Sequence, residues 1–179
     1  MASEAWYDVI TRDFVAGEYV WTGFDYLGEP TPANGTGPGA VTSWPSPKNS
    51  YFGIVDTAGL PKDSYYFYQS QWNEDVNTLH VLPTWNEDSL MKDSSGKVEV
   101  VVYSDAAKVE LKLNDKVVGT QEFEKKTTDA GYTYQTVKGK SGHTSMYMTF
   151  DVPYEEGTLE AVAYNEKGEV IEKNRRSLC

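Results

Sequence analysis

The 179-residue sequence has little cysteine, few basic residues and no long apolar run. Its single cysteine, Cys179, excludes an intrachain disulfide, so no disulfide framework holds the fold together. The 16 Lys and Arg residues face 27 Asp and Glu residues, and the net charge of −11 argues against nucleic acid and anionic membrane surfaces as partners. No segment reaches the roughly 18 consecutive apolar residues of a membrane span, and the N-terminus has no signal-peptide core. We therefore expect no membrane insertion.

The residues that are present suit a folded protein. Apolar residues make up 39% of the sequence and aromatic residues 13%, which allows a packed core and is unlike a disordered chain. Four of the five tryptophans precede residue 79, whereas an alternation rich in Lys and Glu follows it. This change predicts a first domain over residues 1–78, a second over 79–174 and a tail over 175–179.

The first of these parts has the pattern of an α/β unit. Helical spacing of apolar residues predicts a helix over residues 3–15. The nearly continuous apolar run at 18–25 is typical of a strand buried on both faces of a parallel sheet. Residues 28–50 are dense in Gly, Pro, Ser and Asn and predict an irregular loop. A short strand at 51–55 and a helix at 61–72 follow.

From residue 79 the apolar residues recur with period two, which predicts an all-β domain. The expected strands are 79–82, 97–103, 108–113, 116–119, 132–137, 145–150 and 158–164. Tight turns are expected at Asn114-Asp115 and at 166–168. About seven short strands at this spacing predict an antiparallel sandwich of immunoglobulin type.

Candidate binding residues gather where the predicted buried strand ends, which is where α/β barrels place their sites. They are Trp21, Asp25, Tyr26 and Glu29, with Trp44, Asn49 and Ser50 further along the loop. Aromatic rings stack on the C–H faces of sugars, while carboxylates and amides bond hydroxyl groups. An acidic, aromatic rim therefore suits a neutral carbohydrate. The alternative, that these aromatic residues only pack the strand and loop, stays open.

No pair of carboxylates stands out as a glycosidase pair. Glu18 and Asp25 lie seven residues apart on one strand, or roughly 23 Å, which is too far for the known mechanisms. Distance does not exclude Asp25 with Glu29, although Asp25 can equally serve to orient a neighbour. His80, expected at the surface or rim, and His143 have no partners at metal-ligand spacing, so we expect no metal. No motif for a cofactor is present.

Longer motifs carry a resemblance to a known family. Residues 14–32 (FVAGEYVWTGFDYLGEPTP) resemble the last barrel strand of glycoside hydrolase family 2, in its bacterial β-galactosidase branch. Residues 44–63 and 65–72 extend the similarity, and 79–86 and 109–115 resemble the immunoglobulin-like domain after the barrel. The large cell-surface enzymes of streptococci are the most similar type. The resemblance implies an α+β fragment: the last β/α portion of a TIM barrel, then an all-β immunoglobulin-like sandwich.

This resemblance also implies a function. It implies a retaining hydrolase of terminal β-galactosides that uses two glutamates from earlier barrel strands, so the chain alone is expected to be inactive, with no catalytic residue. By this matching Trp21 forms a wall of the galactose subsite, and Trp44, Asn49 and Ser50 rim the same pocket. The implied partners are a galactoside or glycan and the remainder of the barrel, without a cofactor. The implied location is extracellular or at the bacterial cell wall.

Two other hypotheses stay open. The sandwich could be a non-catalytic carbohydrate-binding module, for which Tyr132, Tyr134 and Tyr147 are the best candidates, or a structural spacer in a surface protein. An isolated barrel strand exposes unpaired edges, so we expect residues 1–78 to be less stable than 79–174. The last residues, 172–179, depart from the family pattern.

Overall fold

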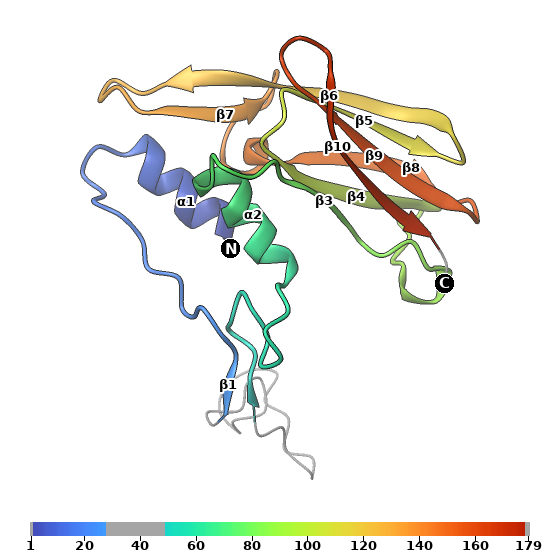
Figure 1. Cartoon of the computed structure of the whole chain (residues 1–179), viewed down its shortest axis with the longest axis horizontal. Coiled ribbons are helices and arrows are strands. Elements are labelled where there is room, and N and C mark those ends of the chain that lie inside the picture. Colours follow the sequence, from blue (N-terminus) through green and yellow to red (C-terminus); the bar gives the residue numbers. More distant parts are fainter. Residues whose placement is uncertain (1, 28–48, 178–179) are drawn as a thin grey trace. The chain divides into compact units, whose positions relative to one another are not determined.

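The computed structural model describes residues 2–27 and 49–177 (Figure 1), which divide into two compact units. One unit contains Met1–Glu18 and Tyr66–Cys179, and the other contains Tyr19–Tyr65. The sequence predicted a division between residues 78 and 79, so the compact units divide the chain differently. The reason is that long-range packing, which composition does not reveal, joins the helices to the sandwich.

Two helices contribute to this packing. Helix α1 (Ala2–Thr11) is shorter than the predicted 3–15, and helix α2 (Asp63–Trp72) is close to the predicted 61–72. The ring of Tyr7 in α1 meets Tyr134 edge-on at 6.5 Å, and Phe67 in α2 meets Tyr103 at 5.6 Å. No helix among the described residues is long and apolar enough to cross a membrane.

A β-sandwich makes up most of the larger unit. The order in its five-stranded sheet is β10-β9-β5-β6-β7, and in its three-stranded sheet β3-β4-β8, with antiparallel pairing between neighbours. The strands are β3 (Leu79–Leu82), β4 (Lys97–Ser104), β5 (Lys108–Leu113), β6 (Lys116–Thr127), β7 (Thr133–Val137), β8 (Met148–Pro153), β9 (Thr158–Tyr164) and β10 (Val170–Ser177). Two short 3₁₀ helices, η1 (Glu87–Ser89) and η2 (His143–Met146), join them. The predominantly β architecture predicted for this part is confirmed.

Alternation along the strands explains the core between the two sheets. In β4 the side chains of Val98, Val100 and Val102 are buried, and each contributes about 1.5–3 kcal/mol relative to exposure. Trp85 is fully buried beside them, and its indole N–H donates to the Glu155 carbonyl oxygen at 3.0 Å. The ring thus satisfies its one polar group while filling the core.

The last strand, β10, extends into the tail that the sequence predicted at 175–179. Arg175 and Arg176 belong to β10, which pairs with β9. Arg175 Nε lies 2.7 Å from Glu160 Oε1, and Arg176 Nε donates to the Val81 carbonyl oxygen at 3.1 Å. The strand was missed because this edge strand is mostly exposed and has few apolar residues. The expected strand at 145–150 also begins later, at β8, because η2 precedes it.

His80 is buried, and the prediction that it lies at the surface or rim was wrong. Its exposed fraction is 7%, and its ring stacks on Tyr66 of α2 with 4.0 Å between centroids. Arg176 Nη2 of β10 lies 3.3 Å from His80 Nδ1. Elements distant in sequence therefore cover this position of β3, and alternation within one strand does not indicate what covers it.

The smaller unit has a parallel pairing at its centre. Residues 22–25 run beside residues 52–55, with a parallel bridge between Phe24 and Val55. The N–H group of Val55 donates to the Gly23 carbonyl oxygen at 3.0 Å. Next to it, two short strands, β1 (Tyr26–Leu27) and β2 (Asn49–Ser50), pair antiparallel with each other.

The strands predicted at 18–25 and 51–55 do not form as regular strands: the two segments share one isolated bridge, between Phe24 and Val55. The run at 18–25 was also expected to be buried on both faces, and it is not. The exposed fractions are 73% for Trp21 and 63% for Phe24. Burial on both faces requires cover on both sides of a sheet, whereas the described backbone partners of residues 22–25 are residues 52–55. The same apolar run therefore exposes aromatic side chains.

Candidate functional site

The predicted site residues fall into three groups in the structure. Trp21, Asp25 and Tyr26 are described with their side chains, as is Ser50, which is fully buried. Asn49 lies in β2, where its backbone pairs with Leu27. Trp44 and Glu29 lie outside the described residues. The site predicted from the sequence can therefore be built only on the strand 22–25 and its partner.

Asp25 is buried, with its side chain 2% exposed, and forms a polar centre of the smaller unit. Its Oδ1 accepts from Lys62 Nζ at 2.6 Å and from the Gly53 N–H group at 2.8 Å. Lys62 Nζ also donates to the Tyr51 carbonyl oxygen at 3.2 Å. The carboxylate thus links three segments, which is the positioning role that the sequence had left open for it.

The close approach of the two parallel segments depends on Gly53. A Cβ atom built there lies 2.6 Å from the Val55 carbonyl oxygen and closer still to the backbone of Phe24 and Asp25. No side chain fits in that space without displacing backbone. Gly53 and Asp25 together therefore hold the segment 22–25 that directly follows Trp21.

Four aromatic side chains of the two paired segments are exposed. Trp21 and Phe24 belong to one segment and Tyr51 and Phe52 to the other, with exposed fractions from 43% to 73%. Sequence reasoning named Trp21 and missed the other three as site residues. The missing information was that residues 22–25 pair with residues 52–55, which no local spacing in the sequence reveals. Such exposed rings can stack on an apolar face such as that of a sugar ring.

Glu18, which lies outside this cluster, has a shifted pKa. Burial raises the pKa of Glu18, and the hydrogen bond from the Tyr68 hydroxyl partly opposes that shift. The pKa of Tyr68 is raised to about 12, first by burial and then by the Glu18 charge. The Oε1 atom of Glu18 is buried without a hydrogen-bond partner. Both residues belong to the larger unit, so this pair is no part of the Asp25 centre.

The tyrosines proposed for glycan contact on the sandwich are not equivalent. Tyr132 is 62% exposed, whereas Tyr134 is half-buried against Tyr7 of α1. Tyr147 packs edge-on against Tyr103 at 6.0 Å, and burial raises its pKa. Tyr147 therefore contributes mainly to packing. Within residues 2–27 and 49–177, no group of three His, Cys, Asp or Glu side chains could hold a metal ion.

Comparison with known proteins indicates where such a chain occurs. Residues 95–172 match a family model described as "Domain of unknown function (DUF4982)". The chain is 38% identical over 161 residues to the β-galactosidase BoGH2A of Bacteroides ovatus, which covers 89% of this chain and 15% of that protein. It is also 38% identical over 152 residues to a putative β-glucuronidase of Formosa agariphila, covering 83% of this chain and 12% of that protein.

A solved structure shows the same fold. The β-glycosidase from Bacteroides vulgatus superposes with a TM-score of 0.62 at 27% identity, over 90% of this chain and 16% of that one. The chain therefore spans only 15% of the length of that β-galactosidase and 16% of that of the β-glycosidase. Sequence and fold together show that the chain is similar to one part of these glycosidases, and that its residues 95–172 match the DUF4982 model.

Proposed function

We propose that the chain is part of a retaining β-galactosidase that hydrolyses terminal β-galactosides in glycans. In this proposal, Trp21 supplies a wall of the galactose subsite, and the sandwich is an accessory domain. Both catalytic glutamates belong to another part of a longer protein. The matches to a β-galactosidase and to a putative β-glucuronidase over most of the chain support a glycosidase, and the motif around Trp21 supports the β-galactosidase branch.

The observation that carries the proposal is an exposed tryptophan next to a hydrogen-bonded segment. The indole of Trp21 is 73% exposed, four residues before the buried carboxylate of Asp25, which is held by Lys62 and Gly53. Exposing an indole forfeits about 1.5–3 kcal/mol of burial unless another group covers it. A sugar ring and the remaining barrel strands are the covering groups that we propose.

Charge favours a galactoside over a glucuronide. A uronic acid carboxylate needs an available cation, and the described cations before residue 79 are both paired with carboxylates. Arg12 Nε lies 2.8 Å from Asp8 Oδ1, and Lys62 Nζ lies 2.6 Å from Asp25 Oδ1. An acidic chain with paired cations suits a neutral sugar.

The geometry of Asp25 supports an inactive isolated chain. A retaining glycosidase needs two carboxyl groups about 5–5.5 Å apart at the glycosidic bond, with one free to attack. The Asp25 carboxylate is 2% exposed and already accepts from Lys62 and Gly53. We therefore assign it to positioning the strand and not to chemistry.

Hydrolysis of a chromogenic β-galactoside by the purified chain tests this assignment. We expect no turnover above that of a heat-denatured sample. If turnover occurs and Asp25→Asn abolishes it without loss of fold, the carboxylate is catalytic and the proposal is wrong. Turnover of a chromogenic β-glucuronide by a longer protein, without turnover of the galactoside, would contradict the choice of substrate.

We also propose an extracellular or cell-wall location for the longer protein, by its similarity to the surface β-galactosidases of streptococci. Detection of the protein in a cell-wall fraction tests this location. A non-catalytic glycan-binding role for the sandwich is the second candidate. Two hollows on the larger unit, lined by aromatic rings and amides, favour it.

A further inference from the structure

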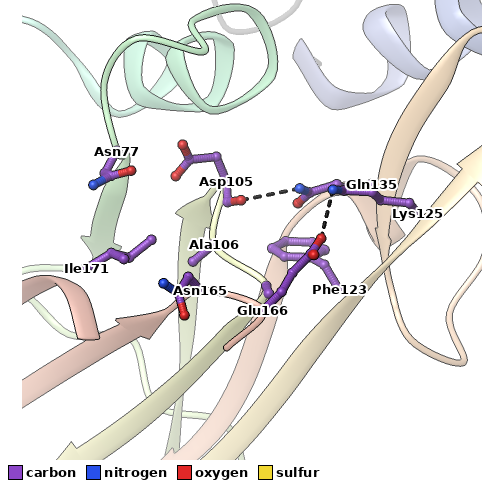
Figure 2. A pocket seen from close by; sticks show the side chains of 10 residues that line it. Asn77, Asp105, Ala106, Phe123, Lys125, Gln135, Asn165, Glu166 and Ile171 are labelled. Atoms are coloured by element: carbon purple, nitrogen blue, oxygen red, sulfur yellow. Dashed lines mark hydrogen bonds and ion pairs between the residues drawn. The ribbon is translucent and has the colours of Figure 1, made fainter. Parts of the chain in front are cut away.

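Two adjoining hollows open on the larger unit, between the sandwich and the helices. Their volumes are about 350 and 440 Å³, within the range of small-molecule sites. They share Asp105, Lys125 and Gln135 as lining residues, so we treat them as one depression, the Gln135 hollow. Figure 2 shows the first of them, with Gln135 and Lys125 on one side and Asn77 on the other.

The lining combines aromatic rings with amides. Phe123 lines the first hollow, and Trp6 and Tyr134 line the second. Amide groups from separate elements surround these rings; they belong to Asn77, Gln135 and Asn165 in the first hollow and to Gln71 and Asn73 in the second. Amides both donate and accept hydrogen bonds, as do sugar hydroxyls, and the rings offer faces to the sugar C–H groups.

The charges of the lining oppose an anionic ligand. The carboxylates are Asp105, Glu166 and Glu74, against one amine, Lys125. The amine is paired already, because Lys125 Nζ lies 2.8 Å from Glu166 Oε1. Burial raises the pKa of Asp105, although its Oδ1 accepts the Thr78 N–H group at 2.8 Å. A carboxylate or phosphate brought here would meet uncompensated negative charge.

The backbone around the hollow is held in place. The Gln135 amide donates to the Asp105 carbonyl oxygen at 3.2 Å, which ties β7 to the turn between β4 and β5. The ring of Tyr134 is supported edge-on by Tyr7 of α1. A site held in this way loses little conformational entropy when it binds a ligand.

We propose that the Gln135 hollow binds a neutral saccharide of two or more units, with Tyr134 as a stacking surface and the amides as hydroxyl partners. Two adjoining hollows suit a short chain of sugars better than a single ring. The inference concerns the larger unit alone and does not rest on the galactoside pocket proposed above. Failure of either proposal leaves the other intact.

The test is titration of the ¹⁵N-labelled 179-residue chain with a neutral galactose tetramer, and separately with a galacturonic acid tetramer. We expect millimolar binding of the neutral sugar, with shifted amide signals at Tyr134, Gln135 and Asp105, and much weaker binding of the acidic one. Absence of saturable shifts at these amides would overturn the proposal. Equal binding of both tetramers would overturn the assignment to neutral sugars.

Variants separate the stacking surface from general stability. Tyr134→Ala should raise the Kd about threefold or more, whereas Tyr134→Phe, which keeps the ring, should bind within about twofold of the original. The matched control is Tyr164→Ala, a half-buried tyrosine that lies outside both hollows, beside Lys108. If Tyr164→Ala weakens binding and Tyr134→Ala does not, the site lies elsewhere. Gln135→Leu supplies a second variant that retains the ring but removes the amide, and unchanged binding by it would likewise contradict the model of recognition.

Discussion

Replacement of Gly53 by alanine should separate the two parallel segments of the smaller unit. The added Cβ atom would lie 2.6 Å from the Val55 carbonyl oxygen and nearer still to the backbone of Asp25 and Phe24. Because those neighbours are backbone atoms, relief requires that the segments move apart. That movement breaks the bond from the Gly53 N–H group to Asp25 Oδ1, now 2.8 Å long.

The expected magnitude follows from the bonds at risk. A hydrogen bond to a charged group is worth about 1.5–3 kcal/mol, and each backbone bond about 1 kcal/mol. Four backbone bonds join residues 22–25 to residues 52–55. Partial loss of this set, together with overpacking, should cost about 3 kcal/mol of local stability.

Amide hydrogen exchange measures this loss where it occurs. At about 3 kcal/mol, the protection of the Ile54 and Val55 amides should fall roughly a hundredfold, while β4 and β5 in the sandwich keep theirs. The matched control is Gly23→Ala, since a Cβ atom at Gly23 meets nothing within 4 Å. That variant should leave protection unchanged or raise it slightly, by about 0.4–1 kcal/mol. Equal protection in Gly53→Ala and the original chain would refute the close approach and the support of Trp21 that depends on it.

Three further changes test the packing and charge arguments. Trp85→Ala should lower the free energy of unfolding of the sandwich by about 3–5 kcal/mol, measured by urea denaturation, because it empties a fully buried position. Lys62→Met should destabilise the smaller unit by about 2–3 kcal/mol, measured by limited proteolysis, because it leaves the buried Asp25 carboxylate without its cation. Glu18→Gln should stabilise the chain at neutral pH, because burial raises the Glu18 pKa and its ionisation opposes folding. In thermal unfolding that gain should vanish below pH 4.5, the ordinary Glu pKa, where the carboxyl is protonated in both states; a gain that persists there would contradict the assignment.

The sandwich was predictable because its signal is local. Alternation along β4 and β5 places Val100 and Leu111 in the core without knowledge of other strands. The turn at Asn114-Asp115 was predictable as well, since both residues adopt positive φ angles of 50° and 65°, which Asn and Asp tolerate. Strand β10 was missed because its stability comes from pairing with β9, and its own residues are mostly exposed.

The candidate site was less predictable because it depends on long-range contacts. Trp21 and Asp25 could be named from a motif, but the role of Asp25 follows from Lys62, 37 positions away, and from Gly53. The Gln135 hollow joins residues from both helices, from β6, β7 and β10, and from the β4–β5 and β9–β10 turns, so no spacing in the sequence reveals it. Charge and residue type were still informative, because both lines of reasoning led to a neutral sugar.

The central claim is that Trp21 forms part of a galactoside pocket, and kinetics of the longer protein that contains this chain test it most directly. Trp21→Ala should lower kcat/KM for a chromogenic β-galactoside about thirtyfold, corresponding to about 2 kcal/mol of lost stacking and burial. Trp21→Phe should retain most activity. Leu60→Ala, a change at another exposed apolar residue of the same unit, should stay within about twofold. A folded Trp21→Ala protein with unchanged kcat/KM would contradict the account.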